Sequence, residues 1–494
     1  MSETTPSATP AAAVTAAADE NEYRAQRLAN MEALRAAGQR PFGRSFKRTG
    51  TLAETAAAYA DDLNVALAGR IIALREMGKS IFGHIQDGSG RFQFYVQRPA
   101  IGDESFAAFR KLDIGDHVGL TGTLFTTRTG EKTIRVATWE LLSKALLPLP
   151  DKWSGLQDQE VRYRQRYLDL VANPSVRAVF DARSRIISHC RSFLEGRGYF
   201  EVETPILQPI AGGASANPFQ THYAALGQPM YMRIAPELYL KKLLVGGYDK
   251  VFELGKDFRN EGLDRSHNPE FTVLEIYEAY GDCSTMMELI QSLVSSCAQA
   301  VCGAMDLPAT ATRPAINLTP PWRVAPYHDL VREHLGADWF DRPLADVREW
   351  ARGQGLDIPD DFNHDDVTHE CYDKLIEKTL IQPTFVTRLP RKLVPLAKTC
   401  EDDPALVDVY ELVVNGRELC PGYTELNDPI DQRARLLEQA AGDVSKLDLD
   451  FLTALEHGMP PAGGLGIGID RLVMILTGAD SIRDVLLFPQ MKNV

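Results

Sequence analysis

The chain has 494 residues, of which 44% are hydrophobic and 24% charged, with 37 glycines and 29 prolines. These values are ordinary for globular proteins, so they exclude collagen-like, coiled-coil and fully disordered chains, and the length predicts about three compact units. The formal charge of −14 argues at first against a nucleic-acid partner, but a whole-chain charge hides local patches.

Cysteine spacing and one long uncharged stretch bear on the cellular compartment of the chain and on whether it has a membrane partner. The seven cysteines are scattered and form no CxxC pair, which argues against a zinc knuckle or a disulfide framework and favours the cytoplasm. Residues 204–232 contain no Asp, Glu, Lys or Arg and are long enough to span a bilayer, but they include four prolines. Lipid would leave such a backbone unsatisfied, so we expect no membrane partner.

The N-terminal part of the chain changes character near residue 20. Residues 1–20 are rich in Ala, Thr and Pro and lack Lys and Arg, which predicts a disordered tail rather than a targeting peptide. Residues 21–64 form a segment that begins with a helical pattern, and its first part, 21–50, has a net charge of +5. This basic segment is predicted either to contact phosphates or to present a solvated helix face.

Residues 65–148 have the pattern of a small all-β barrel such as an OB-fold. About five short strands are separated by Gly-containing turns, with one helical insert near 105–112. Aromatic and amide side chains alternate on two of these strands: Phe82, His84, Phe92, Gln93 and Phe94. One half of them is free to stack on unpaired bases, and the other half would lie in the core. Residues 149–165 contain Pro and Gly and are predicted to be a linker.

The remaining residues, 166–494, are predicted to form one large α+β domain. Helical periodicity recurs at 174–197, 234–246, 283–303, 343–355, 366–380, 429–441 and 470–477. Asp428 and Pro429 make a clear helix start, because Asp caps the first turn and Pro suits the first helical position.

A run of alternating glycines points to a ligand site in this domain. Gly464, Gly466 and Gly468 alternate with apolar residues, so a strand here has one buried face and one face without side chains. A flat ligand can lie on that bare face, which Asp470 is predicted to share, and Arg471 opens the helix that follows. The glycines lie within the strand rather than in a strand-to-helix turn, which argues against a Rossmann dinucleotide site.

Two further strand pairs bring charged groups toward the same site. Two strands joined by residues 260–269 place Phe271, Glu275 and Tyr277 on one face, with Arg259 and His267 in the connection, a pair suited to phosphate oxygens.

Asn415 and Gly416 predict a tight hairpin, which pairs Val413 with Glu418 and makes Glu411 its diagonal neighbour. Two such carboxylates suit Mg²⁺, and the alternative is an acidic hairpin that faces solvent.

These residues carry a resemblance to class II aminoacyl-tRNA synthetases. FRNE at 258–261 with HNPEF at 267–271 resembles their motif 2, GLGIGIDR at 464–471 resembles motif 3, and GYFEVETPIL at 198–207 resembles motif 1. RIAPELYLK at 233–241 and YTELND at 423–428 look like lysyl-tRNA synthetases of the bacterial type in particular. The resemblance covers nearly everything from residue 21 to the end, including the barrel.

The resemblance implies a site and a fold. The implied fold is an antiparallel-sheet catalytic domain preceded by the OB-fold, assembled as a homodimer through motif 1. ATP would be bound by Arg259, Glu261, His267, Phe271, Glu411 and Arg471, with Arg259 and Arg471 as the catalytic arginines. Lysine would be bound by Gly213, Glu237, Glu275, Tyr277 and Glu425, Mg²⁺ by Glu411 and Glu418, and the anticodon by Phe82, Gln93 and Glu131.

The implied reaction is ATP-dependent activation of L-lysine, followed by transfer to the 3′ end of tRNA(Lys). Such a reaction needs no covalent enzyme group, because positioning and charge neutralisation supply the catalysis. One alternative is a synthetase paralogue that passes lysine or an analogue to an acceptor other than tRNA. Another is a non-catalytic tRNA-binding module.

Overall fold

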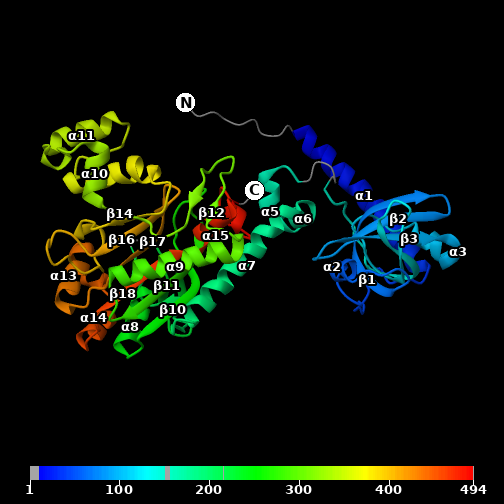
Figure 1. The fold of residues 1–494 in the computed structure, drawn as a ribbon, viewed down its shortest axis with the longest axis horizontal. Coiled ribbons are helices and arrows are strands. Elements are labelled where there is room, and N and C mark those ends of the chain that lie inside the picture. The colour runs from blue at the N-terminus through cyan, green and yellow to red at the C-terminus, as the bar shows by residue number, and fades with distance from the viewer. Residues whose placement is uncertain (1–9, 151–155, 215, 493–494) are drawn as a thin grey trace. The chain divides into compact units, whose positions relative to one another are not determined.

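The computed structural model describes residues 10–150, 156–214 and 216–492, and the chain divides into two units, 1–157 and 158–494 (Figure 1). The division falls inside the predicted linker 149–165. That linker is partly helical, because Gln159–Arg164 forms α5, and Asp158 caps it by accepting hydrogen bonds from two backbone N–H groups. Tyr163 on α5 is buried and bonds to Asp484, so α5 packs within the second unit.

The first unit is a closed five-stranded barrel, as the sequence predicts. Its strands follow the order β1-β2-β3-β5-β4, and all neighbours are antiparallel except β3 and β5. The bounds are β1 Asn64–Met77, β2 Ser80–Gln86, β3 Arg91–Gln97, β4 His117–Thr126 and β5 Lys132–Ser143, with the predicted insert split into α3 Arg98–Ile101 and α4 Asp103–Phe109. Phe92 and Phe94 lie in the barrel core, whereas Phe82, His84 and Gln93 are half-buried on the outer face.

The N-terminal helix begins earlier than predicted. Residues 1–9 of the expected tail lie outside the described residues, and α1 spans Pro10–Ala36, where alanines strongly favour a helix. Arg27 on α1 is buried and donates hydrogen bonds to the carbonyls of Ile114 and Ala145, and Leu34 enters the barrel core. Part of the basic charge of 21–64, which also contains α2 Leu52–Ala57, therefore fixes the helix to the barrel.

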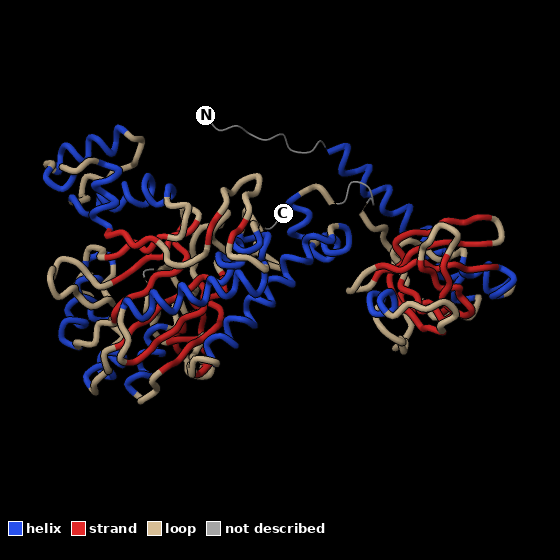
Figure 2. Tube along the Cα trace, in the orientation of Figure 1, coloured by secondary structure: helices blue, strands red, loops and turns tan. Residues whose placement is uncertain are grey.

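The second unit is built on an eight-stranded sheet of order β14-β15-β16-β17-β18-β11-β10-β6, whose strands are drawn as red tubes in Figure 2. The strand bounds are β6 Phe200–Glu201, β10 Lys250–Phe258, β11 Glu270–Ala279, β14 Arg323–Pro326, β15 Thr384–Thr387, β16 Val409–Val414, β17 Arg417–Thr424 and β18 Ala462–Gly468. The six central strands are antiparallel, as implied, but the pairs at both edges, β6 with β10 and β14 with β15, are parallel. Two small sheets complete the strands: β7 Leu207–Gln208, β8 Gln220–Tyr223 and β9 Gln228–Met232 form one, and β12 Asp306–Leu307 and β13 Ile316–Asn317 form the other.

Helices cover the sheet and extend one end of it. The predicted helices correspond to α7 Pro174–Glu195, α8 Glu237–Val245, α9 Cys283–Cys302, α11 Leu344–Gly353, α12 His364–Cys371, α13 Pro429–Gln439 and α15 Ile469–Thr477. Further helices are α6 Arg166–Ala172, α10 Tyr327–Leu335, α14 Leu449–Glu456 and α16 Ile482–Val485. Helices α7 and α9 lie along one face of the sheet (Figure 1), where Leu274, Ile276, Leu465 and Ile467 join their core. Among the described residues no helix is long and apolar enough to cross a membrane.

Asp470 departs from its predicted position. Strand β18 ends at Gly468, so Asp470 lies in the first turn of α15 rather than on the bare strand face. Its buried carboxylate accepts hydrogen bonds from Arg183 on α7 at 2.5 Å and from the Thr272 backbone N–H at 2.8 Å. These contacts fix the start of α15, and therefore the position of Arg471, against the sheet.

Candidate active site

Strand register places the bare glycine face directly beside the functional side chains of β11. Gly464 pairs with Tyr277, Gly466 with Glu275, and Gly468 with Val273. Side chains from neighbouring elements occupy the space beside these glycines. A Cβ on Gly464 would lie 2.0 Å from Glu425 Oε1 and 2.5 Å from the Tyr277 ring. The glycines therefore leave a bare strand surface, which can form the floor of a ligand site, and they also leave space for buried polar groups.

A pocket of about 230 Å³ lies over this floor. Most of the residues implied in ATP binding line it: Arg259, Glu261, His267, Phe271 and Arg471. Glu275, Glu418 and Gly466 line it as well, but Glu411 does not. The structure thus brings together, from β10, β11, β17, β18 and α15, residues more than 200 positions apart in the chain.

The cationic side chains of this pocket are held in place by aromatic and polar contacts. The Arg259 guanidinium lies 5.1 Å from the centre of the Phe271 ring, so Phe271 faces a cation in the free protein. His267 bonds through Nδ1 to Asp264 at 2.8 Å, and its Nε2 lies 3.3 Å from Nη2 of Arg471. Burial acts against it, but hydrogen bonds from His267 and Ser266 hold the pKa of Asp264 below its usual value. Donors from two elements therefore converge where a phosphate group would lie.

The acidic hairpin forms, but its register shifts. Asn415 and Gly416 both have positive φ (57° and 66°), as the tight turn requires, and Val413 pairs with Glu418 as predicted. A bulge at Leu419 then places Glu411 opposite Pro421, so the prediction that Glu411 is the diagonal neighbour of Glu418 is wrong. The extra residue in one strand of the hairpin shifts every later pair by one position.

The two hairpin carboxylates suit a divalent cation. Burial, followed by the charges of Glu418 and Glu377, raises the pKa of Glu411 well above its usual value. Glu418 has only a 4.0 Å approach from Arg471, and no hydrogen bond or ion pair joins the side chain of Glu411 to another described residue. In the described part of the chain no three His, Cys, Asp or Glu side chains are placed to hold a metal together. Among the described residues Glu411 has no cationic partner and Glu418 has only Arg471, so the two carboxylates fit Mg²⁺, with remaining ligands from phosphate oxygens.

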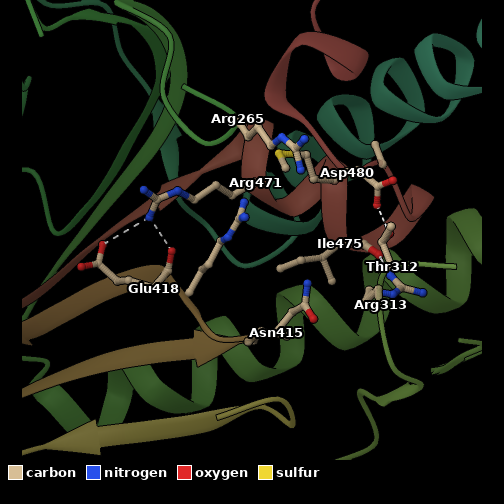
Figure 3. A pocket seen from close by; sticks show the side chains of 12 residues that line it. Arg265, Thr312, Arg313, Asn415, Glu418, Arg471, Ile475 and Asp480 are labelled. Carbon is tan, nitrogen blue, oxygen red and sulfur yellow. Dashed lines mark hydrogen bonds and ion pairs between the residues drawn. The ribbon is translucent and has the colours of Figure 1, made fainter. Parts of the chain in front are cut away.

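A second pocket of about 220 Å³ adjoins the first and shares Glu418 and Arg471 with it (Figure 3). Arg471 points toward Glu418 and donates a hydrogen bond to its backbone carbonyl at 2.5 Å. Arg265 and Arg417 line the same pocket and add positive charge. Sequence reasoning missed both, although Arg265 lies two residues before His267 and Arg417 follows the hairpin turn.

The residues implied in lysine binding gather in a buried acidic cluster beside the first pocket. Glu237, Tyr277 and Glu425 are 6%, 3% and 1% exposed. Tyr277 donates a hydrogen bond to Glu275 at 3.0 Å, which links the cluster to the pocket. Gly213 adopts φ +85°, and a Cβ there would lie 3.3 Å from the Glu237 Cβ, so the Gly213 loop lies against Glu237.

Sequence reasoning also missed a fully buried lysine in this acidic cluster. Lys241 lies one helical turn after Glu237 on α8, with Nζ 2.7 Å from Glu237 Oε1 and 2.5 Å from Glu425 Oε2. Lys241 and Glu425 therefore form a buried ion pair, and Oε1 of Glu425 has no hydrogen-bond donor among the described residues. The spacing of Glu237 and Lys241 was the available signal.

The outer face of the barrel presents an aromatic ladder. Phe82 stacks on Tyr95 with ring centres 4.4 Å apart, and Tyr95 contacts Phe125 at 5.9 Å. Arg135 lies over the other side of Phe125 at 4.6 Å. Beside the ladder, Glu131 accepts hydrogen bonds from Gln93 at 2.6 Å and binds His84 at 2.8 Å. The structure therefore brings the three residues implied in anticodon binding onto one face and adds Tyr95 and Phe125.

Comparisons with known proteins agree with this arrangement. Residues 158–492 match the family described as "tRNA synthetases class II (D, K and N)", and residues 65–142 match the "OB-fold nucleic acid binding domain". The lysine–tRNA ligases of Pelotomaculum thermopropionicum and Bacillus subtilis are each 47% identical to this chain, over 485 and 489 residues. Those alignments cover 96% of this chain, with 96% of the first relative and 98% of the second. The chain therefore belongs to the class II aminoacyl-tRNA synthetases and, among them, to the lysine–tRNA ligase family.

Proposed function

We propose that the protein activates L-lysine with ATP and transfers it to the 3′ end of tRNA(Lys). The observation that carries this proposal is the buried carboxylate pair of Glu237 and Glu425, which among the described residues shares one cation, Lys241, beside a pocket lined by Arg259, His267 and Arg471. Two buried carboxylates that share one ammonium group favour a further cation, and the ε-ammonium group of lysine supplies one. The arginines and the histidine suit the phosphates of ATP.

The first step is attack of the lysine carboxylate on the α-phosphorus of ATP. A P–O bond to the carboxylate forms, the bond to the β-phosphate breaks, and lysyl-adenylate and pyrophosphate result. Arg259 binds the α-phosphate, while His267 and Arg471 bind the γ-phosphate. Phe271 stacks on adenine, and Glu261 contacts the same nucleotide. Neutralising the charge that develops on the phosphates is the main catalytic contribution of these residues.

Glu411 and Glu418 would hold Mg²⁺. When bound, the ion neutralises phosphate charge and orients the leaving group. The lack of other cationic partners for these two carboxylates supports this assignment.

Lysine is recognised at both of its ends. Gly213 and Glu237 receive the α-ammonium group, and Glu425 binds the ε-ammonium group beside Tyr277 and Glu275. Burial raises the pKa of Glu425 to about 8, so lysine binding to its ionised form releases a proton at neutral pH. The Michaelis constant (KM) for lysine should accordingly fall as the pH rises toward 8.

Gly464 offers a direct test of this lysine site. Gly464→Ala places a methyl group against Glu425 and Tyr277, so we expect the KM for lysine to rise at least about tenfold with little change for ATP. ATP–pyrophosphate exchange at varied lysine measures this effect.

Gly466→Ala is the matched control, because the nearest protein atom to its Cβ would be 3.5 Å away. We expect a smaller rise in the KM for lysine from this variant. Equal effects of the two substitutions would contradict the placement of Glu425 and Tyr277 in the lysine pocket.

In the second step a hydroxyl at the tRNA 3′ end attacks the lysyl carbonyl carbon and releases AMP. The barrel would bind the anticodon, with Phe82 stacking on a base and Gln93 and Glu131 reading base edges. The ladder of Phe82, Tyr95 and Phe125 supports this role, because stacked rings extend the surface available to unpaired bases.

Tyr95→Ala should weaken tRNA binding without affecting lysine activation. Loss of one stacking partner is expected to raise the KM for tRNA by about 5- to 100-fold, since each base stack is worth roughly 1–3 kcal/mol. Aminoacylation kinetics measure this, with lysine-dependent exchange and Phe42→Ala, an exposed ring outside the ladder, as controls. A change in exchange, or an unchanged KM for tRNA, would contradict the proposed anticodon surface.

We further propose that the protein is a homodimer. We also propose a cytoplasmic location, because the seven free cysteines favour a reducing compartment. The domain boundaries at 20, 64, 148 and 165 remain predictions. The paralogue alternative and the tRNA-binding-module alternative differ from the main proposal in measurable ways.

Pyrophosphate exchange with each proteinogenic amino acid, followed by charging of a tRNA pool, tests the proposed function. We expect exchange with lysine and charging of tRNA(Lys). Lysine exchange without charging would favour a paralogue with another acceptor, and no exchange with any amino acid would favour a non-catalytic module.

A further inference from the structure

Lys241 occupies an unusual position for a charged side chain. It is completely buried, and its ammonium group lies between two carboxylates, those of Glu237 on its own helix and Glu425 after β17. The Tyr423 ring centre is 5.6 Å from Nζ, and the Tyr423 hydroxyl donates to Glu237 Oε1 at 2.7 Å. The mechanism proposed above does not use this lysine.

The ammonium of Lys241 is charged in this environment. Burial lowers its pKa, but the charges of Glu237 and Glu425 outweigh burial and raise the pKa above the usual value for lysine. In turn, Lys241 opposes the effect of burial on the pKa of Glu425. Lys241 and Glu425 therefore stabilise each other's charged forms, whereas the charge of Glu237 acts against the ionisation of Glu425.

Lys241 leaves one oxygen of each carboxylate free for a ligand. On Glu237 it shares Oε1 with Tyr423, so Oε2 remains. On Glu425 it approaches Oε2, whereas Oε1 points toward the bare strand at Gly464. A carboxylate oxygen can thus meet each ammonium group of a bound lysine while Lys241 stays in place.

The groups packed around Lys241 set the net charge of the proposed lysine site. Besides Tyr423 on β17, β11 contributes Tyr277 and Glu275, and Glu275 faces Asp257 and Arg259 at the pocket end. Of the groups nearest the substrate, Glu237, Glu275 and Glu425 are acids, and Lys241 is the cation. When the three acids ionise, two negative charges remain uncompensated, and the two ammonium groups of lysine supply two positive charges.

We propose that Lys241 is a positioning residue for amino-acid selection, whose ammonium group orients Glu237 and Glu425 and favours the ionised form of Glu425, so that the pair receives the two ammonium groups of the substrate. The inference rests on the proposed function. Without Lys241, Glu425 would ionise only at a still higher pH, because burial and the charge of Glu237 already oppose its ionised form. Lysine would then bind poorly until that higher pH was reached.

Lys241→Met tests this role, because methionine has a similar length and no charge. We expect the KM for lysine in pyrophosphate exchange to rise at least about tenfold at pH near 7, the equivalent of one pKa unit, and the fall of this KM with rising pH to move to higher pH by about one unit. The kcat and the KM for ATP should change little. Lys242→Met is the matched control, since Lys242 pairs with Asp450 at the surface of the same helix.

Each outcome decides the inference. A lysine KM that is unchanged, or that rises by the same factor at every pH, or that rises together with the KM for ATP, would overturn it. Should the methionine variant not fold, Lys241→Gln removes the same charge but keeps a donor, and the same pH profile is expected from it. Absence of lysine-dependent exchange in the unaltered protein would instead refute the proposed function itself.

Discussion

Arg259→Ala is expected to abolish lysine-dependent ATP–pyrophosphate exchange, with a loss of at least about 1,000-fold, because one oriented donor is typically worth 10²–10³ and the guanidinium offers two. Arg259 lies in the pocket above Phe271, at the start of the connection that also carries His267. His267 and Arg471 approach each other at 3.3 Å and are assigned to the γ-phosphate, so neither is expected to replace Arg259 at the α-phosphate.

Two further variants separate the loss of chemistry from a loss of folding. Arg259→Lys keeps the charge but loses the planar fork, so an intermediate activity is expected. Arg323→Ala removes an exposed arginine on the edge strand β14, where it pairs with Glu333, and should leave exchange unchanged. Near-normal exchange by the Arg259→Ala variant, with normal thermal unfolding, would refute the assignment of the α-phosphate site.

Much of the fold was predictable because local patterns and tertiary structure agree. The alternating glycines from Gly464 to Gly468 predicted a strand with one bare face, and the register with β11 confirms it. The Asn415–Gly416 turn fixed the first pairs of its hairpin. Such features depend on backbone sterics over a few residues, which the sequence expresses directly.

Other features depend on contacts between distant residues and were missed. The bulge beyond Val413 moves Glu411 opposite Pro421; a proline in this strand indicates altered hydrogen bonding, but it does not say where the register shifts. The burial of Lys241 requires that α8 and the end of β17 meet, which no local pattern expresses. Likewise, Tyr95 and Phe125 join one ladder only because the barrel closes.

The alternation of aromatic residues in the barrel strands predicted two faces but not which of the two is buried. Period 2 requires that one set of side chains be buried, but it does not say which set. The structure buries Phe92 and Phe94 and leaves Phe82 and Gln93 on the outer face. The residues implied in anticodon binding by the family resemblance therefore lie on the face that can reach an RNA.

Glu425→Gln is expected to raise the KM for lysine at least about 100-fold, because breaking a buried ion pair by removing one partner costs about 3–5 kcal/mol. The substitution keeps the size of the side chain, and the KM for ATP should stay nearly constant because Glu425 does not line the nucleotide pocket. In the unaltered protein, burial raises the pKa of Glu425 to about 8, so the carboxylate is increasingly ionised, and lysine binds more tightly, as the pH rises from 7 to 9. The glutamine variant has no such group and should lose this pH dependence.

Pyrophosphate exchange at varied lysine and pH measures both effects of Glu425→Gln. Glu438→Gln, an exposed position on α13, is the control and should match the unaltered protein. A variant that keeps the steep pH dependence would show that another group, such as Glu275 with its raised pKa, controls lysine binding. A variant with an unchanged KM for lysine would show that Glu425 does not contact the ε-ammonium group and serves instead as the buried partner of Lys241.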